Sequence, residues 1–222
     1  MSDTAERKII GGVGIFLLAT EILKQLMLTF VVNGGAYSWW NFPWQLCSIP
    51  MYVCLAAVFS AKLYDTCLSF LSTFGLMAGC AAFLDVSGFN LSHPLLTAHS
   101  YVWHFVLIGL GIFAAARRKS FHFLPPLLIY LGTVAVAQII NVTAFDAGHR
   151  PINMFYISPK YVFSQPVIKE LVPVIGNNGA ITVYIIVCIA VACLINVAEK
   201  YLRSHMRAEK AERKIHGSRK KV

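Results

Sequence analysis

A cysteine and a histidine inside apolar stretches are the residues of this chain best suited to covalent chemistry. Cys47 lies in the run WQLCSIP at 44–50, and His104 lies in another apolar stretch farther along the chain. A thiolate is a nucleophile, and a neighbouring imidazole can take the proton of the thiol. Pro50 removes a backbone hydrogen bond beside the thiol, so we expect a kinked helix and a pocket there. If the two side chains meet, we expect acyl transfer through an acyl-cysteine intermediate.

Acyl transfer also needs hydrogen-bond donors for the oxyanion that develops on the substrate carbonyl. Gln45, Trp103 and Asn141 carry N–H groups of the kind required. Ser48 and His99 add polar groups close to the two reactive residues in the sequence. We therefore expect these five side chains to support the reaction or bind the substrate.

Simpler explanations exist for the reactive and ionisable residues inside apolar stretches. None of the six cysteines forms a C-x-x-C pair, so we expect no metal site, no disulfide framework and no cofactor; cysteine also packs well as a small apolar residue. A single histidine within a membrane often serves as a helix-to-helix hydrogen bond. Glu21 and Lys24 are three residues apart on one helical face, where they form either a structural ion pair or a proton relay.

The composition of the chain indicates a membrane protein. Its 222 residues are 57% hydrophobic and 13% charged, with a mean hydropathy of +0.65, whereas soluble domains carry about 25% charged residues. These values exclude a cytosolic enzyme, a disulfide scaffold and a disordered chain. Because a transmembrane helix needs roughly 20 apolar residues, the chain has room for several spans and for no sizeable soluble domain.

Long apolar runs bounded by turn residues predict an all-α polytopic membrane protein, with a bundle of six transmembrane helices in residues 1–199. The expected spans are about 9–32, 44–60, 63–84, 95–116, 121–143 and 179–198. The outer loop at 144–178 carries prolines and aromatic residues that indicate an ordered lid. At 1.5 Å per residue, Cys47 lies about 5 Å and His104 about 13 Å below the outer surface. We therefore expect one outward-facing site, where most polar residues of the spans converge.

The distribution of Lys and Arg predicts that both termini are cytoplasmic, because cytoplasmic flanks retain positive charge. This orientation places every Lys and Arg on the inner side except Lys24, Arg150, Lys160 and Lys169. In the tail at 200–222, basic residues recur at steps of three and four, which places them on one face of a helix. We expect this face to bind the anionic cytoplasmic leaflet rather than nucleic acid, since Tyr201 is its single aromatic stacking residue.

The run FPWQLCSI at 42–49, together with His104 and the segment NMFY at 153–156, resembles the YwaF-like family of bacterial integral membrane proteins. That family is distantly similar to a eukaryotic membrane acyltransferase of ether phospholipids and to the androgen-induced intramembrane lipid hydrolases. The resemblance extends from the first helix through the sixth. It implies that Cys47 accepts the acyl group and that His104 is its base. The segment that begins at Asn153 is similar to a family segment of unknown role.

One position departs from the pattern of that family. Its members commonly carry a histidine two positions before the cysteine, where this chain has Gln45. Glutamine donates and accepts hydrogen bonds but does not shuttle protons at neutral pH. Proton transfer therefore falls to His104 or His99.

The leading hypothesis from the sequence is a membrane thiol enzyme, an acyltransferase or a lipase, that acts on phospholipid acyl chains in the outer leaflet. The lipid would bind between helices and pass its acyl group to Cys47. The same composition also fits a non-catalytic six-helix component that binds or transports a solute through an outward-facing pocket. A third alternative is a structural protein whose polar groups only join helices.

Overall fold

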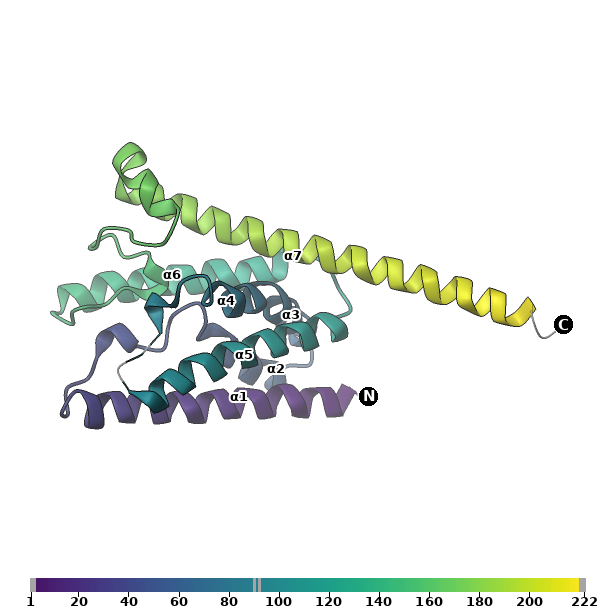
Figure 1. The fold of residues 1–222 in the computed structure, drawn as a ribbon, viewed down its shortest axis with the longest axis horizontal. Coiled ribbons are helices and arrows are strands. Elements are labelled where there is room, and N and C mark those ends of the chain that lie inside the picture. The colour runs from purple at the N-terminus through teal and green to yellow at the C-terminus, as the bar shows by residue number, and fades with distance from the viewer. Residues whose placement is uncertain (1–2, 90, 92, 220–222) are drawn as a thin grey trace.

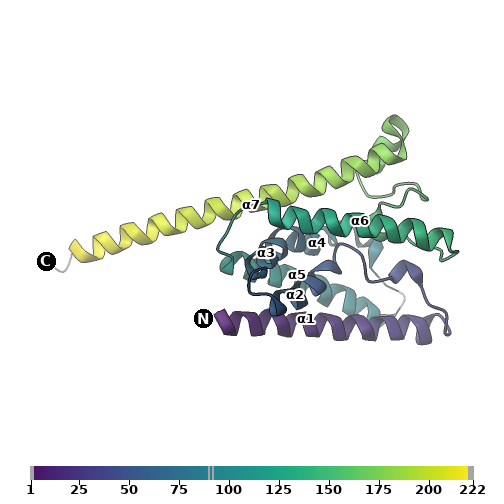
Figure 2. The ribbon, with the colours of Figure 1, turned by 180° about the vertical axis from the view of Figure 1, so that it is seen from behind.

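The chain folds as a bundle of helices in the computed structural model, which describes residues 3–89, 91 and 93–219 (Figures 1 and 2). No strand occurs in these ranges, so the prediction of an all-α fold is confirmed. The elements are α1 (Asp3–Leu26) with its π-helical extension η1 (Met27–Val32), α2 (Ile49–Phe59), α3 (Tyr64–Phe70), the π-helical η3 (Leu71–Gly75), α4 (Leu76–Ala81), α5 (Pro94–Arg117), α6 (Leu124–Asp146) and α7 (Val172–Arg219). Because α3, η3 and α4 follow one another without a break, they form a single rod.

Four helical stretches of the described chain are long and apolar enough to cross a membrane: Thr4–Val32, Pro94–Arg117, Leu124–Asp146 and Ile168–Glu209. They fit a membrane protein. α2, with 11 residues, and the rod of α3, η3 and α4 are shorter than the roughly 20 residues of a full span. Six complete spans therefore stay a prediction. The start of α1 and the end of α7 lie at the same end of the bundle, which we name the tail end; the opposite end is the loop end (Figure 1).

Two helix boundaries differ from the prediction. α2 begins at Ile49 instead of near residue 44, and Pro50 occupies its first turn, where a missing N–H has no intrahelical partner to lose. The expected kink at Pro50 is wrong, because the preceding residues form turns and the proline begins the helix. α7 begins at Val172 instead of near residue 179, bends at Gly176 (φ 73°) and continues as a helix through the basic tail (Figure 1).

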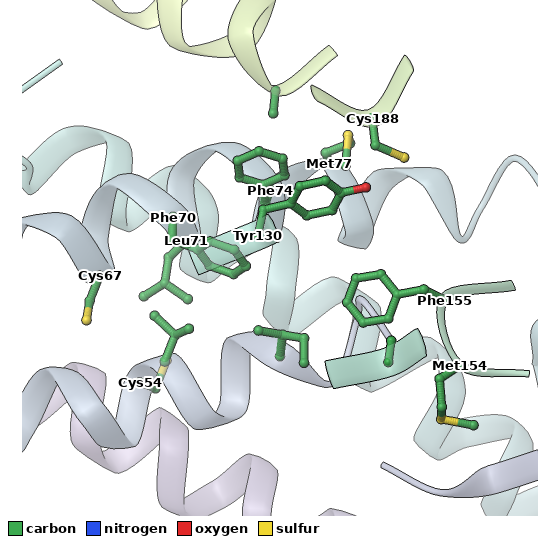
Figure 3. Close-up of a cluster of buried hydrophobic side chains, with 14 of the residues drawn as sticks. Cys54, Cys67, Phe70, Leu71, Phe74, Met77, Tyr130, Met154, Phe155 and Cys188 are labelled. Atoms are coloured by element: carbon green, nitrogen blue, oxygen red, sulfur yellow. The ribbon is translucent and has the colours of Figure 1, made fainter. Parts of the chain in front are cut away.

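Aromatic stacking fills the centre of the bundle (Figure 3). The ring of Phe74 in η3 stacks on Tyr130 of α6, with centroids 4.5 Å apart, and on Phe70 of α3 at 5.5 Å. All three side chains are fully buried. Three cysteines lie in the same apolar cluster as free thiols: Cys54, Cys67 and Cys188. They pack as small apolar residues, which is the simpler explanation that the sequence offered for them.

Polar contacts at the tail end fasten α7 to the corner between α5 and α6. The fully buried Arg118 forms an ion pair with Glu199 at 2.8 Å and donates a hydrogen bond to Asn196 at 2.8 Å. Arg203 donates to the backbone carbonyls of Arg118 and Ala116. The expectation that the polar residues of the helices converge on the outer half is therefore incomplete, because a second polar cluster lies at the tail end.

Close packing of α4 against α5 depends on Gly111. A Cβ atom at this position would lie 2.7 Å from the Leu76 Cβ and 3.2 Å from the Leu71 carbonyl oxygen, so Gly111→Ala must push the two helices apart. We expect the free energy of unfolding in detergent to fall by about 1–3 kcal/mol. Gly109→Ala is the matched control, since nothing lies within 4 Å of its Cβ position. Equal stability of the two variants would contradict this packing.

Candidate functional site

Two adjoining cavities bring the predicted nucleophile and the predicted base together. The first has a volume of about 150 Å³ and the second of about 80 Å³. Five residues line both cavities: Gln45, Cys47, Gly88, His104 and Tyr156. Cys47, in the turn before α2, and His104, on α5, therefore border a common space although they lie in distant parts of the sequence.

Cys47 lies deeper than its position near the start of a span predicts. The indole N–H of Trp103 donates to the Cys47 carbonyl at 3.0 Å, and Trp103 is about 14 Å from the start of α5 at 1.5 Å per residue. The predicted depth of about 5 Å assumed a helix beginning near residue 44, whereas this segment folds into the bundle as turns. Trp103 is thereby committed to the backbone, and its predicted role as an oxyanion donor is not supported.

The hydrogen bond of His104 determines which nitrogen can act as a base. Its Nδ1 lies 2.7 Å from the Ser100 carbonyl oxygen, and a carbonyl only accepts hydrogen bonds. The proton of the neutral ring is therefore on Nδ1, and Nε2 carries the lone pair. The ring stacks on Phe89 with centroids 4.8 Å apart, which fixes its plane. His104 is thus a buried, oriented imidazole whose free lone pair can accept a proton.

Among the further polar residues that line the second cavity are Glu21, Lys24, Ser48 and His99. Ser48 and His99 were predicted to belong to the site. Glu21 and Lys24 form the expected ion pair at 2.8 Å, but the sequence did not connect that pair with the thiol and imidazole. The depth of the ion pair could have indicated this connection from the sequence. Lys24 lies roughly 11 Å from the loop end of its helix, close to the level of His104. No cluster of three or more potential metal ligands occurs in the described ranges.

The two side-chain amides expected to serve an oxyanion bind backbone groups instead. Gln45 donates from Nε2 to the Asn153 carbonyl at 3.0 Å and accepts the Phe155 N–H at 2.7 Å. Asn141 donates to the Met154 carbonyl at 3.0 Å and accepts the Met154 N–H at 2.5 Å. Each amide thus satisfies one donor and one acceptor of the same loop. Gln45 and Asn141 thus hold this loop, and their use in catalysis stays a prediction, since each amide nitrogen carries a second N–H.

Residues 152–158, here named the inserted segment, enter the bundle instead of covering it. Met154 and Phe155 are almost fully buried, and Figure 3 shows Phe155 near Tyr130 in the core. Asn153 uses its side-chain oxygen to accept the Ser158 N–H at 2.9 Å, and it lines neither cavity. This part of the outer loop is therefore a wall of the site rather than the expected lid, and Asn153 has a structural role.

The inserted segment adds a residue that the sequence did not single out. Phe155 and Tyr156 both have positive φ angles, 56° and 59°, in the left-handed region that non-glycine residues rarely adopt. Such a conformation costs about 1–3 kcal/mol for each residue and persists only where surrounding contacts impose it. Here it places Tyr156 against both cavities. The position of Tyr156 depends on how the inserted segment is paired with Gln45. No local sequence pattern encodes that pairing, so the sequence could not have indicated this residue.

An apolar groove of about 210 Å³ lies between α1 and α5 and leads toward the second cavity. Phe16 and Leu23 line it from α1, and Val102 lines it from α5. Three residues line both the groove and the second cavity: Lys24, His99 and Trp103. The groove therefore adjoins, through these three residues, the cavity that Cys47 and His104 line.

Asn141 should be essential for holding the inserted segment. Asn141→Leu removes both hydrogen bonds to Met154, so the buried backbone N–H and C=O of Met154 lose their partners. Each unpaired group should lower the free energy of unfolding by about 1–3 kcal/mol. We expect a lower unfolding midpoint and faster hydrogen exchange at residues 152–158. Thr143→Val on the same helix is the control, since its hydroxyl is exposed and bonds only to Ile139 within α6. Unchanged exchange in Asn141→Leu would contradict this anchoring role.

Comparisons with protein-family models, curated proteins and solved structures find no match for this chain. The resemblance to the YwaF-like family therefore stays a prediction from sequence, and the two cavities and the groove are the features of the molecule that bear on its function.

Proposed function

We propose that this protein is an integral membrane enzyme that transfers acyl groups of phospholipids through an acyl-Cys47 intermediate, with His104 as the base. The observation that carries the proposal is the shared cavity, which is lined by both Cys47, a free cysteine, and the oriented His104. Covalent catalysis needs a substrate-sized space beside both residues, whereas a helix-joining histidine or a packing cysteine has no need of one.

The reaction begins when Nε2 of His104 accepts the proton of the Cys47 thiol. The sulfur attacks the ester carbonyl of the lipid, a C–S bond forms, and the carbonyl π electrons move to oxygen. The tetrahedral intermediate then expels the alkoxide of a lysophospholipid, which receives the proton held on His104. In the second half, His104 takes a proton from an acceptor hydroxyl or from water, whose oxygen attacks the thioester and regenerates the thiol.

The groove between α1 and α5 supports a membrane lipid as the substrate. Its lining is apolar, and it lies between two helices that are long and apolar enough to span a membrane. A lipid acyl chain in this groove would have its carbonyl end near Lys24 and Trp103, at the junction with the second cavity. A freely soluble substrate would have no use for such a groove.

The proposed orientation places both termini in the cytoplasm and the cavities in the outer half of a cell membrane. The common location of the start of α1 and the end of α7 fits this arrangement (Figure 1). The exposed Lys200 and Arg207 would meet anionic headgroups where α7 leaves the bilayer, whereas Arg203 is bonded to carbonyls of the bundle. Farther along, α7 continues straight and carries its basic residues away from the bundle (Figure 2).

Acyl transfer is tested with purified protein in vesicles of a phospholipid that carries a labelled acyl chain. The wild type should acquire label on Cys47 that hydroxylamine releases as expected for a thioester. Cys47→Ser should form no such thioester, and His104→Ala should slow labelling by about 100-fold or more, because general-base catalysis is lost. Cys193→Ala is the control, since Cys193 lines neither cavity.

Labelling that is unaffected by Cys47→Ser, or no labelling of the wild type, would contradict the proposed enzyme. Tight binding of a water-soluble metabolite that survives Cys47→Ala would instead identify a solute-binding component. Loss of stability in Cys47→Ala without any lipid chemistry would identify a structural protein.

Access through the groove is tested with a bulky residue in its wall. Val102→Trp should fill the groove and lower the rate with long-chain phospholipids while leaving alkylation of Cys47 by a small water-soluble reagent unchanged. Ile139→Trp places the same side chain on an exposed face of α6 and is the matched control. Equal rates for the two variants would show that substrate arrives by another path.

A further inference from the structure

One hydroxyl group borders both cavities and has no hydrogen-bond partner among the residues that the structure describes. Tyr156 lines the two cavities together with Cys47 and His104. Within the described ranges, its hydroxyl makes no hydrogen bond. The three donors expected from the sequence are committed to backbone groups: Gln45, Trp103 and Asn141. The single N–H of Trp103 is thereby used, whereas Tyr156 keeps a free hydroxyl beside Cys47 and His104.

Three features hold the Tyr156 side chain in this position. Its backbone is fixed by the left-handed pair at 155–156, and the Phe155 N–H of this pair donates to the Gln45 side-chain oxygen. The edge of the Trp40 ring contacts the tyrosine ring, with centroids 6.0 Å apart. A Cβ atom at Gly88 would lie 2.5 Å from the tyrosine oxygen, so the hydroxyl occupies space that only glycine leaves open.

We propose that Tyr156 is a catalytic residue of this site, whose hydroxyl donates a hydrogen bond to the oxyanion formed when Cys47 attacks an acyl ester. This inference rests on the proposed function. As the C–S bond forms, the electron pair of the carbonyl moves to oxygen, and the Tyr156 O–H stabilises the negative charge there without giving up its proton. When the alkoxide leaves, the electron pair returns to re-form the carbonyl of the thioester.

The protonation state of Tyr156 fits a donor rather than a base. Burial raises the pKa of Tyr156 to about 12, and negative charge on Cys47 or Asp85 raises it in the same direction. The hydroxyl therefore keeps its proton throughout the neutral pH range. A fixed donor of this kind in a water-poor site is worth about 100-fold in rate or more.

The test compares the rate of Cys47 acylation in single turnovers with a labelled phospholipid. Tyr156→Phe removes only the oxygen and should lower this rate by about 100-fold, with little change in the lipid concentration that gives half-maximal rate. Gly88→Ala should slow acylation as well, because its methyl group displaces the hydroxyl. Tyr101→Phe, on a partly exposed ring outside both cavities, is the matched control.

Alkylation of Cys47 by iodoacetamide separates a catalytic donor from a structural residue, because alkylation forms no oxyanion. Its rate should be equal in the wild type and in Tyr156→Phe. Slower alkylation in the variant would assign Tyr156 to the structure of the site and overturn the inference. Unchanged acylation in Tyr156→Phe, with acylation abolished by Cys47→Ser, would also overturn it while leaving the proposed function in place. A wild type that forms no acyl-Cys47 would overturn both.

Discussion

Backbone N–H and C=O groups enclosed by apolar helices must find partners, and water is not there to supply them. Two irregular segments of this protein lie in such surroundings: the turns that precede α2 and the inserted segment at 152–158. Their partners are side chains of the surrounding helices and of the segments themselves. Gln45 joins the two segments directly, since it belongs to the first and binds the backbone of the second. The geometry of the cavities depends on this pairing.

The strain of the inserted segment and the bonds that hold it are of similar size. Two left-handed residues cost about 2–6 kcal/mol together. The four hydrogen bonds of Gln45 and Asn141 contribute a comparable total, at about 0.5–1.5 kcal/mol each. Burial of Phe155 among the core aromatics adds to the favourable side. Strain of this kind, sustained beside a cavity, is typical of functional sites rather than of packing alone.

The late start of α2, at Ile49, explains both the shortness of this helix and the depth of Cys47. A helix that began near residue 44 would have placed Cys47 close to the loop end and would have satisfied its own backbone. Because α2 begins at Ile49, Cys47 lies in a turn at the level of Trp103, where its carbonyl takes the indole N–H. Pro50, which was expected to bend a helix, instead lies in the first turn of α2.

The amino-acid sequence by itself determined the membrane character, the all-α class and the approximate position of the long helices, because hydropathy and turn residues act locally. It also identified Cys47 and His104 from residue type and depth, and the structure places both on one cavity. Tertiary structure alone decided the uses of Gln45 and Asn141, since an amide binds whichever backbone group packs against it, and Gln45 meets groups more than a hundred positions away. The same long-range pairing set the depth of Cys47 and brought Tyr156 to the cavities. A pattern read along the chain carries no information on such contacts, because their partners are chosen only when the helices pack.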